Sequence, residues 1–203
     1  MVIPDASLAR SCQGCQLHKT RTQVVLPDGP ANGLLVVGEA PGRDEDIQGV
    51  GFIGQAGRNL DRAISEVAGL TRAEYARTNV VRCRPPENRK PKAGEVHACG
   101  TWLDHTISSM TPSVLVAVGQ SAAERLLDLR HEMRRAQART YLTYVDDLLD
   151  RAEAQGASIL PTYRGVPVVP MPHTSPLAWN RKCADGTPIK SLGHRALRLA
   201  VTI

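Results

Sequence analysis

Short apolar runs alternate with longer amphipathic segments along most of the chain. Four of the runs have the length and the flanking turn residues of buried strands, and they cover residues 34–37, 78–81, 114–118 and 166–169. Because such runs are apolar on both faces, they predict a mostly parallel sheet with helices on both sides. Pro167 predicts that the last strand lies at an edge or begins there, since proline cannot donate a hydrogen bond to a neighbouring strand.

Amphipathic segments between and after these strands predict helices. They cover residues 57–68, 94–110, 121–129, 141–155 and 192–201. Strands and helices that alternate in this way are typical of an α/β domain, and we predict one such domain over the whole chain. Residues 130–164 combine charged side chains with apolar ones at helical spacing, which predicts a helical excursion on the surface.

The composition is that of an ordinary globular protein. The chain has 203 residues, of which 42% are hydrophobic and 22% charged, and this length is enough to bury a core without disulfides. No apolar run reaches the ~20 residues of a membrane helix, and residues 1–10 lack the layout of a signal peptide. We therefore expect a soluble, cytoplasmic protein without a membrane partner. The net charge of +5 favours anionic partners only weakly.

The cysteines carry more information than the charge. An odd number, five, without a secretory signal argues against a disulfide framework. Cys12 and Cys15 form a CxxC pair, and Cys83 and Cys99 form a second, wider pair. Four thiolates in an intracellular chain are typical of a zinc site or an iron–sulfur cluster, and the wide second pair fits a zinc ribbon less well. Unrelated buried cysteines are the remaining interpretation, and Cys183, in a polar stretch, is assigned to no site.

Unusual polar segments follow all the predicted strands. They are residues 38–46, 82–92, 119–121 and 173–177. In a parallel α/β sheet, ligands bind beyond the carboxyl ends of the strands. These loops are therefore expected to share one rim, and the candidate site lies there.

Two of the loops have features that are typical of phosphate-binding sites. Gly119, Gln120 and Ser121 open a predicted helix, whose N-terminus either is simply capped by Ser121 or also binds a phosphate group. Residues 82–92 carry five cations among prolines, which suits a nucleic-acid backbone but equally a solvated loop. The arginines of residues 130–164 have the same two interpretations.

Three single residues stand out for their neighbours. Glu39 lies between glycines and a proline, where its carboxylate would orient a ligand or a water, or cap the following turn. His173 follows an apolar strand and is braced by Pro172 and Pro176. Phe52 is flanked by glycines, which would leave its ring free to stack on a flat ligand, although phenylalanine is more often simply buried.

Taken together, these segments resemble the uracil-DNA glycosylase superfamily, and most closely its iron–sulfur branch, the family 4 enzymes. The motifs that carry the resemblance run in family order along nearly the whole chain. They are the CxxC pair, LVVGEAPG at 35–42, GFIGQAG at 51–57, TNVVRCRPPENR at 78–89, Cys99 with Trp102 and Leu103, and HTSPL at 173–177.

The resemblance implies a three-layer α/β/α domain with a central, mostly parallel, four-stranded sheet, which hydrolyses the N-glycosidic bond of uracil in DNA. Glu39 and His173 would be catalytic: His173 would donate a hydrogen bond to uracil O2, and Glu39 would orient water or shape the pocket. Phe52 would stack on the flipped base, and the Asn79 amide would bond its edge. The residues expected to bind uracil are Gly38, Glu39, Ala40, Phe52, Asn79 and His173.

The same resemblance implies a DNA interface and a cofactor. The residues expected to contact the DNA backbone are Arg82, Arg84, Arg89, Gln120, Ser121 and Ser175. The residues expected to ligate a [4Fe-4S] cluster, with zinc as the alternative, are Cys12, Cys15, Cys83 and Cys99. We expect a structural role for the cluster, uracil-containing DNA as the partner, and a monomer with a single domain over residues 1–203.

Some features depart from the pattern of the superfamily. Ala40 stands where other branches carry a water-activating aspartate, and Gly42 where they carry a bulky residue, as is usual in the iron–sulfur branch. Thr174 replaces a usual proline, and residues 130–164 are longer than expected, which predicts a helical insertion. A basic, histidine-bearing insertion of a uracil-crosslinking subgroup is absent after Pro91, so covalent capture of DNA is not expected.

Two other functions compete with the glycosylase. The first is a non-catalytic protein that binds uracil or damaged DNA on the same scaffold. The second is a zinc or iron–sulfur electron-transfer module, against which stands the lack of a GxGxxG nucleotide-binding motif in residues 38–42.

Overall fold

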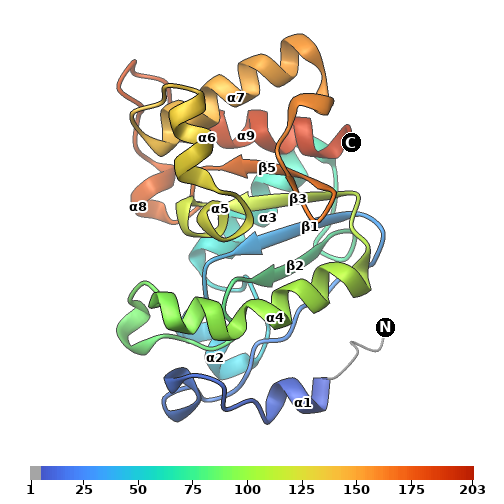
Figure 1. Ribbon diagram of the computed structural model, residues 1–203, viewed down its shortest axis with the longest axis vertical. Coiled ribbons are helices and arrows are strands. Elements are labelled where there is room, and N and C mark those ends of the chain that lie inside the picture. The colour runs from blue at the N-terminus through green and yellow to red at the C-terminus, as the bar shows by residue number, and fades with distance from the viewer. Residues whose placement is uncertain (1–5) are drawn as a thin grey trace.

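A parallel sheet organises the protein, and the computed structural model describes residues 6–203 (Figure 1). The strands are β1 (Leu34–Gly38), β2 (Ala76–Asn79), β3 (Val114–Val118), β4 (Thr162–Tyr163) and β5 (Val166–Met171). Their order in the sheet is β2-β1-β3-β5-β4. Strands β2, β1, β3 and β5 are parallel neighbours, which confirms the predicted mostly parallel sheet.

The sheet has one strand more than predicted. Strand β4 pairs with β5 in the antiparallel direction, and its two residues are too few to leave an alternating pattern in the sequence. Strand β5 begins at Val166, directly before Pro167, so the strand begins where the proline predicted. Pro167 therefore does not interrupt a central strand.

Helices connect the strands. They are α1 (Ala6–Arg10), α2 (Arg43–Gln48), α3 (Gln55–Ala68), α4 (Ala93–Met110), α5 (Gln120–Leu126), α6 (Leu129–Arg135), α7 (Tyr141–Gln155), α8 (Pro176–Trp179) and α9 (Ile189–Val201), with 3-10 turns at Gln16–Lys19, Pro86–Asn88 and Ala157–Ile159. The predicted helix 121–129 is wrong at its end: α5 stops at Leu126, and Asp128 begins α6 by accepting a hydrogen bond from the His131 backbone N–H (3.2 Å).

The helices form a layer on each face of the sheet. Helices α3 and α9 pack together on one face, and α4 and α5 lie on the other, where Arg125 of α5 donates to Asp104 of α4 (2.9 Å) (Figure 1). This arrangement confirms the three-layer α/β/α fold. Residues 130–164 hold α6, α7 and β4, and α7 packs against α9 and β5. That this segment is an insertion relative to the family stays a prediction.

The core lies along the central strands. Every residue of β1 and β3 is buried, as expected for strands that are covered on both faces. Within residues 6–203, no helix combines the length and the apolar character that crossing a lipid bilayer requires. Because β1 and β3 are fully buried, the loops at their carboxyl ends stand on a rigid base.

Candidate active site and cysteine site

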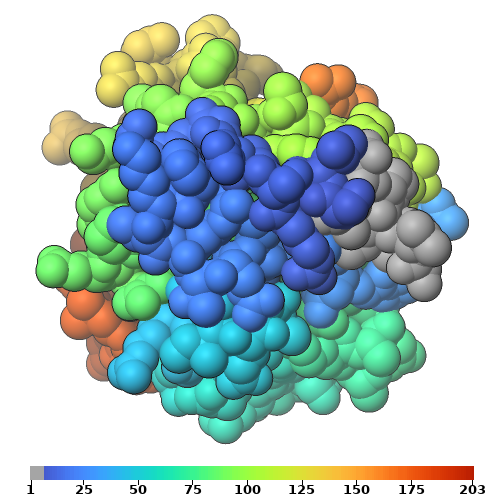
Figure 2. Space-filling model, turned by 90° about the horizontal axis from the view of Figure 1, so that it is seen from below, coloured from blue at the N-terminus to red at the C-terminus, as the bar shows by residue number. Residues whose placement is uncertain are grey.

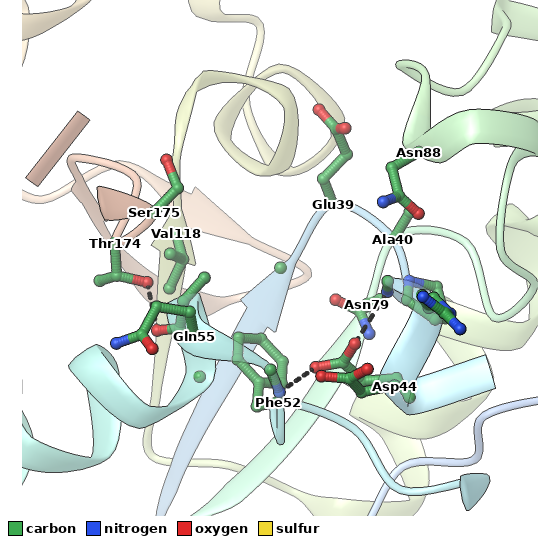
Figure 3. Close-up of a pocket in the computed structure, with 18 of the residues that line it drawn as sticks. Glu39, Ala40, Asp44, Phe52, Gln55, Asn79, Asn88, Val118, Thr174 and Ser175 are labelled. Atoms are coloured by element: carbon green, nitrogen blue, oxygen red, sulfur yellow. Dashed lines mark hydrogen bonds between the residues drawn. The ribbon is translucent and has the colours of Figure 1, made fainter. Parts of the chain in front are cut away.

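A cavity of about 440 Å³ opens at the carboxyl ends of the parallel strands (Figure 3). Loops that follow β1, β2 and β5 line it, together with Val118 at the end of β3. The predicted rim is therefore present for three of its four loops, while Ser121 of the fourth lines a second cavity. The predicted site residues that line it are Gly38, Glu39, Ala40, Phe52, Asn79, Arg89, His173 and Ser175. The structure therefore brings the residues of the distant motifs to one place.

Gly38 lets two of these side chains approach each other. It ends β1 and pairs in register with Asn79 of β2. A Cβ atom at position 38 would lie 2.5 Å from Asn79 Oδ1 and 2.7 Å from Phe52 Cζ, both far inside van der Waals contact. Only glycine leaves the Asn79 amide and the Phe52 ring side by side at the cavity wall.

Phe52 has a strained backbone. Its φ of 57° lies in the left-handed region, where few residues other than glycine occur. The Arg72 guanidinium holds this conformation by donating to Phe52 O (3.0 Å) and to Gly51 O, and Arg72 itself forms an ion pair with Asp61 (3.1 Å). Such local strain concentrates at functional sites, because only specific contacts keep it in place.

Glu45 is a site residue that the sequence analysis missed. Its buried carboxylate accepts hydrogen bonds from the backbone N–H groups of Gly42 (3.0 Å), Ile53 (2.9 Å) and Gly54 (2.7 Å). It therefore ties the loop after β1 to the loop that carries Phe52. The signal available in the sequence was the spacing of a capping box, with a glutamate three residues after Gly42.

His173 is held in one tautomer by its own loop. The Ser175 backbone N–H donates to His173 Nδ1 (3.1 Å), so in the neutral ring the proton is on Nε2. The ring is open to the cavity, yet protein atoms surround it on the concave wall, and this desolvation lowers the pKa of His173 below 6.5, against an opposing effect of the Glu39 charge. Gly119, at φ 84°, makes room for the ring: a Cβ there would lie 3.0 Å from His173 Cδ2.

Glu39 lies between two cavities. A second cavity, of about 490 Å³, adjoins the first, and Glu39 lines both. Figure 3 shows its side chain extending from the end of β1 away from Phe52 and Asn79. The carboxylate is therefore placed at the edge of the first cavity and not against the ring of Phe52.

The predicted DNA contacts have different surroundings. Arg89 lines the cavity and pairs with Glu95 (2.7 Å), and Arg84 is half-buried and donates to Asn88 (2.7 Å). Gln120 is exposed and Ser121 lines the second cavity. The expectation for Arg82 is wrong, because its side chain is buried and donates to Trp102 O (2.9 Å) and to Thr106 Oγ1 beneath α4.

The four predicted cysteine ligands line a separate small cavity, which we call the cysteine site. Cys12 and Cys15 belong to the N-terminal segment, which lies across one face of the molecule beside the chain around α4 (Figure 2). Cys83 follows β2, and Cys99 lies on α4. Burial raises the pKa of the Cys83 thiol and raises that of Cys99 to about 11. Cys183 is not among the lining residues.

The thiols of the cysteine site do not converge on one point. Across residues 6–203, no group of three or more His, Cys, Asp or Glu side chains converges closely enough to hold one metal ion. Arg21 also donates to Cys83 Sγ (3.2 Å), which suits a sulfur that carries negative charge.

Comparison with known proteins agrees with this geometry. Residues 27–191 match the family model described as the uracil DNA glycosylase superfamily. The chain belongs to the uracil-DNA glycosylase superfamily. This membership confirms the resemblance that the motifs carried, since the matched residues include all the loops around the cavity.

Relatives within the superfamily point to one of its types. The chain is 40% identical over 122 residues to a Type-4 uracil-DNA glycosylase of Saccharolobus solfataricus, covering 60% of this chain and 56% of the relative. It is 43% identical over 120 residues to a Type-4 uracil-DNA glycosylase of Archaeoglobus fulgidus, covering 59% and 60%. A Type-5 uracil-DNA glycosylase of Pyrobaculum aerophilum is 32% identical over 121 residues. The chain thus matches less than two thirds of the length of these relatives.

One exposed hydrophobic side chain lies close in sequence to the cavity residue Ser175. Leu177, on the short helix α8 that follows Ser175, is 81% exposed, more than any other large hydrophobic residue described. Its exposure could not be predicted from the sequence, because a leucine after a proline is as often buried as exposed.

Proposed function

We propose that this protein is a DNA repair enzyme that removes uracil from DNA by hydrolysing its N-glycosidic bond. The observation that carries the proposal is the convergence on one cavity of Phe52 and His173, from two loops, and Asn79, from the end of β2. The cavity volume of about 440 Å³ lies in the range typical of small-molecule sites. Free uracil and an abasic site in the DNA would be the products.

Recognition of the base follows from Phe52 and Asn79. A base within a duplex is inaccessible, so the nucleotide must leave the stack, at a cost of a few kcal/mol. The Phe52 ring would then replace the lost stacking. The Asn79 carboxamide offers a donor and an acceptor together, which matches O4 and N3–H of uracil and leaves the amino group of cytosine without a partner.

Bond cleavage follows from His173. As the glycosidic bond breaks, the sugar gains positive charge and uracil leaves with negative charge on O2. The Nε2–H of a neutral His173, fixed by the Ser175 bond to Nδ1, supplies a donor for that oxygen without a proton having to be transferred first. A preorganised donor of this kind contributes about 3 kcal/mol to the lowering of the barrier.

Glu39 is the carboxylate that we assign to the attacking water. Ala40 cannot activate a nucleophile, whereas Glu39 lies at the edge of the cavity on the same loop. We propose that Glu39 orients the attacking water or holds the positive charge that develops on the sugar. The lowered pKa of His173 favours the neutral form of its ring, which is the form that donates through Nε2–H.

DNA would lie over the mouth of the cavity. Arg89 and Ser175 at the rim would contact its phosphates, and Arg84, Gln120 and Ser121 would extend that contact. The exposed Leu177 fits an apolar wedge that enters the gap left by the flipped nucleotide. We propose a monomer that acts on uracil-containing DNA wherever the cell keeps its DNA, in the cytoplasm.

The cysteine site would hold a [4Fe-4S] cluster through Cys12, Cys15, Cys83 and Cys99. When bound, the cluster would supply four bonds that join the N-terminal segment to Cys83 and α4, and no chemistry at the glycosidic bond. The buried Arg82 lies beside these thiols, so this residue serves the cysteine site and not the DNA.

The decisive experiment is the release of free uracil from a single-stranded oligonucleotide with one uracil. The proposal predicts multiple turnover that His173→Ala and Asn79→Ala each abolish or strongly reduce. A protein that binds this oligonucleotide in preference to its thymine counterpart but releases nothing would establish the non-catalytic alternative instead.

A further inference from the structure

A buried threonine directly after His173 forms hydrogen bonds to a different part of the cavity wall. Thr174 is 1% exposed, and its hydroxyl donates to Ala56 O (2.9 Å). In return, Asn59 Nδ2 donates to Thr174 O (2.9 Å). Ala56 and Asn59 both lie near the start of α3, which follows the Phe52 loop. The loop that carries the histidine is thereby bonded to the loop that carries the phenylalanine.

We propose that Thr174 and Asn59 form a latch that fixes the His173 imidazole relative to the Phe52 ring, with Thr174 as a positioning residue for uracil excision. This inference rests on the proposed function. A base held between Phe52 and His173 needs the donor and the stacking ring at a set separation, and small displacements of such groups reduce rates strongly. The latch spans that separation with two hydrogen bonds.

The latch also acts on the tautomer of the histidine. The bond from Ser175 N–H to His173 Nδ1 joins two residues that flank Thr174, so it depends on the backbone path through position 174. Both the side chain and the carbonyl of Thr174 are anchored to α3. Without these anchors the path loosens, Nδ1 loses its donor, and Nε2–H is no longer held toward the cavity.

The backbone at position 174 can also be restrained covalently, by the ring of a proline, instead of by hydrogen bonds. Threonine leaves φ free to vary, whereas proline fixes φ near −65° without any partner. Within residues 6–203, the Thr174 backbone N–H donates no hydrogen bond, so a proline there removes none. If the hydroxyl serves only as a restraint, Thr174→Pro replaces it; if the hydroxyl has a chemical role, proline does not.

The first test compares variants of Thr174 in uracil release from the single-stranded oligonucleotide. Thr174→Val keeps the shape and removes the hydroxyl; we expect kcat to fall about tenfold, the rate equivalent of one hydrogen bond, with KM nearly unchanged. Thr174→Ser and Thr174→Pro should each restore most of the rate. The matched control is Thr202→Val, which removes a hydroxyl-to-carbonyl bond (2.8 Å) at the end of α9 and should leave kcat unchanged.

The second test needs no turnover. In ¹⁵N NMR spectra of the histidine rings, with the His173 signals assigned by their absence from His173→Ala, the unaltered protein should show the Nε2–H tautomer. Thr174→Val should show a mixture of both tautomers. If Thr174→Val does not fold, Asn59→Asp takes its place, because it keeps the shape of Asn59 and loses the donor to Thr174 O.

The outcomes of these experiments test the latch and the proposed function separately. Equal kcat values for Thr174→Val and the unaltered protein, or an unchanged His173 tautomer, would overturn the latch while uracil release still supports the proposed function. A protein that releases no uracil would refute the proposed function, and the tautomer of His173 in the variants would still decide whether the latch exists. Loss of activity in Thr174→Pro equal to that in Thr174→Val would overturn the restraint and leave a chemical role for the hydroxyl.

Discussion

The cavity at the carboxyl ends of the strands and the cysteine site are held together in different ways. Around the cavity, the protein supplies its own braces: Glu45 bonds three backbone N–H groups, Arg72 bonds the Phe52 carbonyl, and Thr174 bonds α3. Around the cysteine site, the thiols have few partners, chiefly Arg21 and the Gly14 backbone N–H (3.5 Å). The first region is preorganised by the chain, whereas the second would be completed by the proposed cluster.

This difference predicts where mutations act. Side chains that face a preorganised cavity contribute little to folding, because their contacts are made with the substrate, so their loss should reduce the rate and spare the stability. Residues that bind a cluster contribute the binding free energy to folding, so their loss should reduce the stability first. The two regions can therefore be separated by measuring rate and unfolding side by side.

The largest effect is expected in the cysteine site. Cys83→Ala should remove the cluster, with its visible colour and its iron and acid-labile sulfide, and lower the free energy of unfolding by more than about 4 kcal/mol, as loss of a bound metal centre does. Chemical denaturation with iron analysis checks this. Cys183→Ala is the matched control, because this half-buried thiol lies outside the cysteine site and should keep the iron. A folded, colourless and fully active Cys83→Ala protein would refute the structural role of the cluster.

A large effect on rate without one on stability is expected at His173. His173→Ala should lower kcat by about 10²–10³, the cost of one preorganised donor, and leave the melting temperature within about a degree of the original value. Single-turnover uracil release and thermal unfolding together check this. The control is His105→Ala, an exposed histidine on α4. A marked loss of stability in His173→Ala would mean that the cavity is not braced independently of its histidine.

The sequence predicted most of this arrangement because the strands and the site follow from strong local patterns. Strands β1, β3 and β5 are apolar enough to be recognised, and parallel strands place their carboxyl ends together whatever the details. The predicted strand 78–81 overlaps β2 (Ala76–Asn79) only at its end, because most of the residues of β2 are polar although they are buried. What the sequence could not predict are properties that depend on burial. Arg82 has the same charge as Arg84, yet only the fold shows that it lies beneath α4. Glu45, in the polar stretch 43–46, is likewise recognisable as a brace only when the Phe52 loop lies next to it.

Glu45 tests whether the cavity braces itself. Glu45→Gln keeps the shape but places an amide group against one of the three N–H donors, so one of these bonds is lost and the others weaken. We expect a loss of about 2 kcal/mol in stability and a fall in kcat of about tenfold as the two loops separate. Glu74→Gln is the control, since its exposed carboxylate accepts a similar bond from the Thr71 N–H (2.8 Å). Equal behaviour of the two variants would show that Glu45 is not a brace.

The smallest effect is the pH dependence, and it follows from His173 Nδ1. Protonation of the ring places a proton on Nδ1, where it opposes the Ser175 N–H, so the loop loses this bond in acid. Because desolvation lowers the pKa of His173, this loss occurs in more acidic solution than it would for an unperturbed imidazole. The unfolded chain binds this proton more readily than the folded one, so the unfolding free energy also declines as the pH falls through 6.5. Profiles of kcat against pH for the unaltered protein and for His173→Gln check this. The decrease in kcat in acid that is due to His173 should vanish in the variant. An identical decrease in both proteins would assign it to another group, with Glu39 the next to examine.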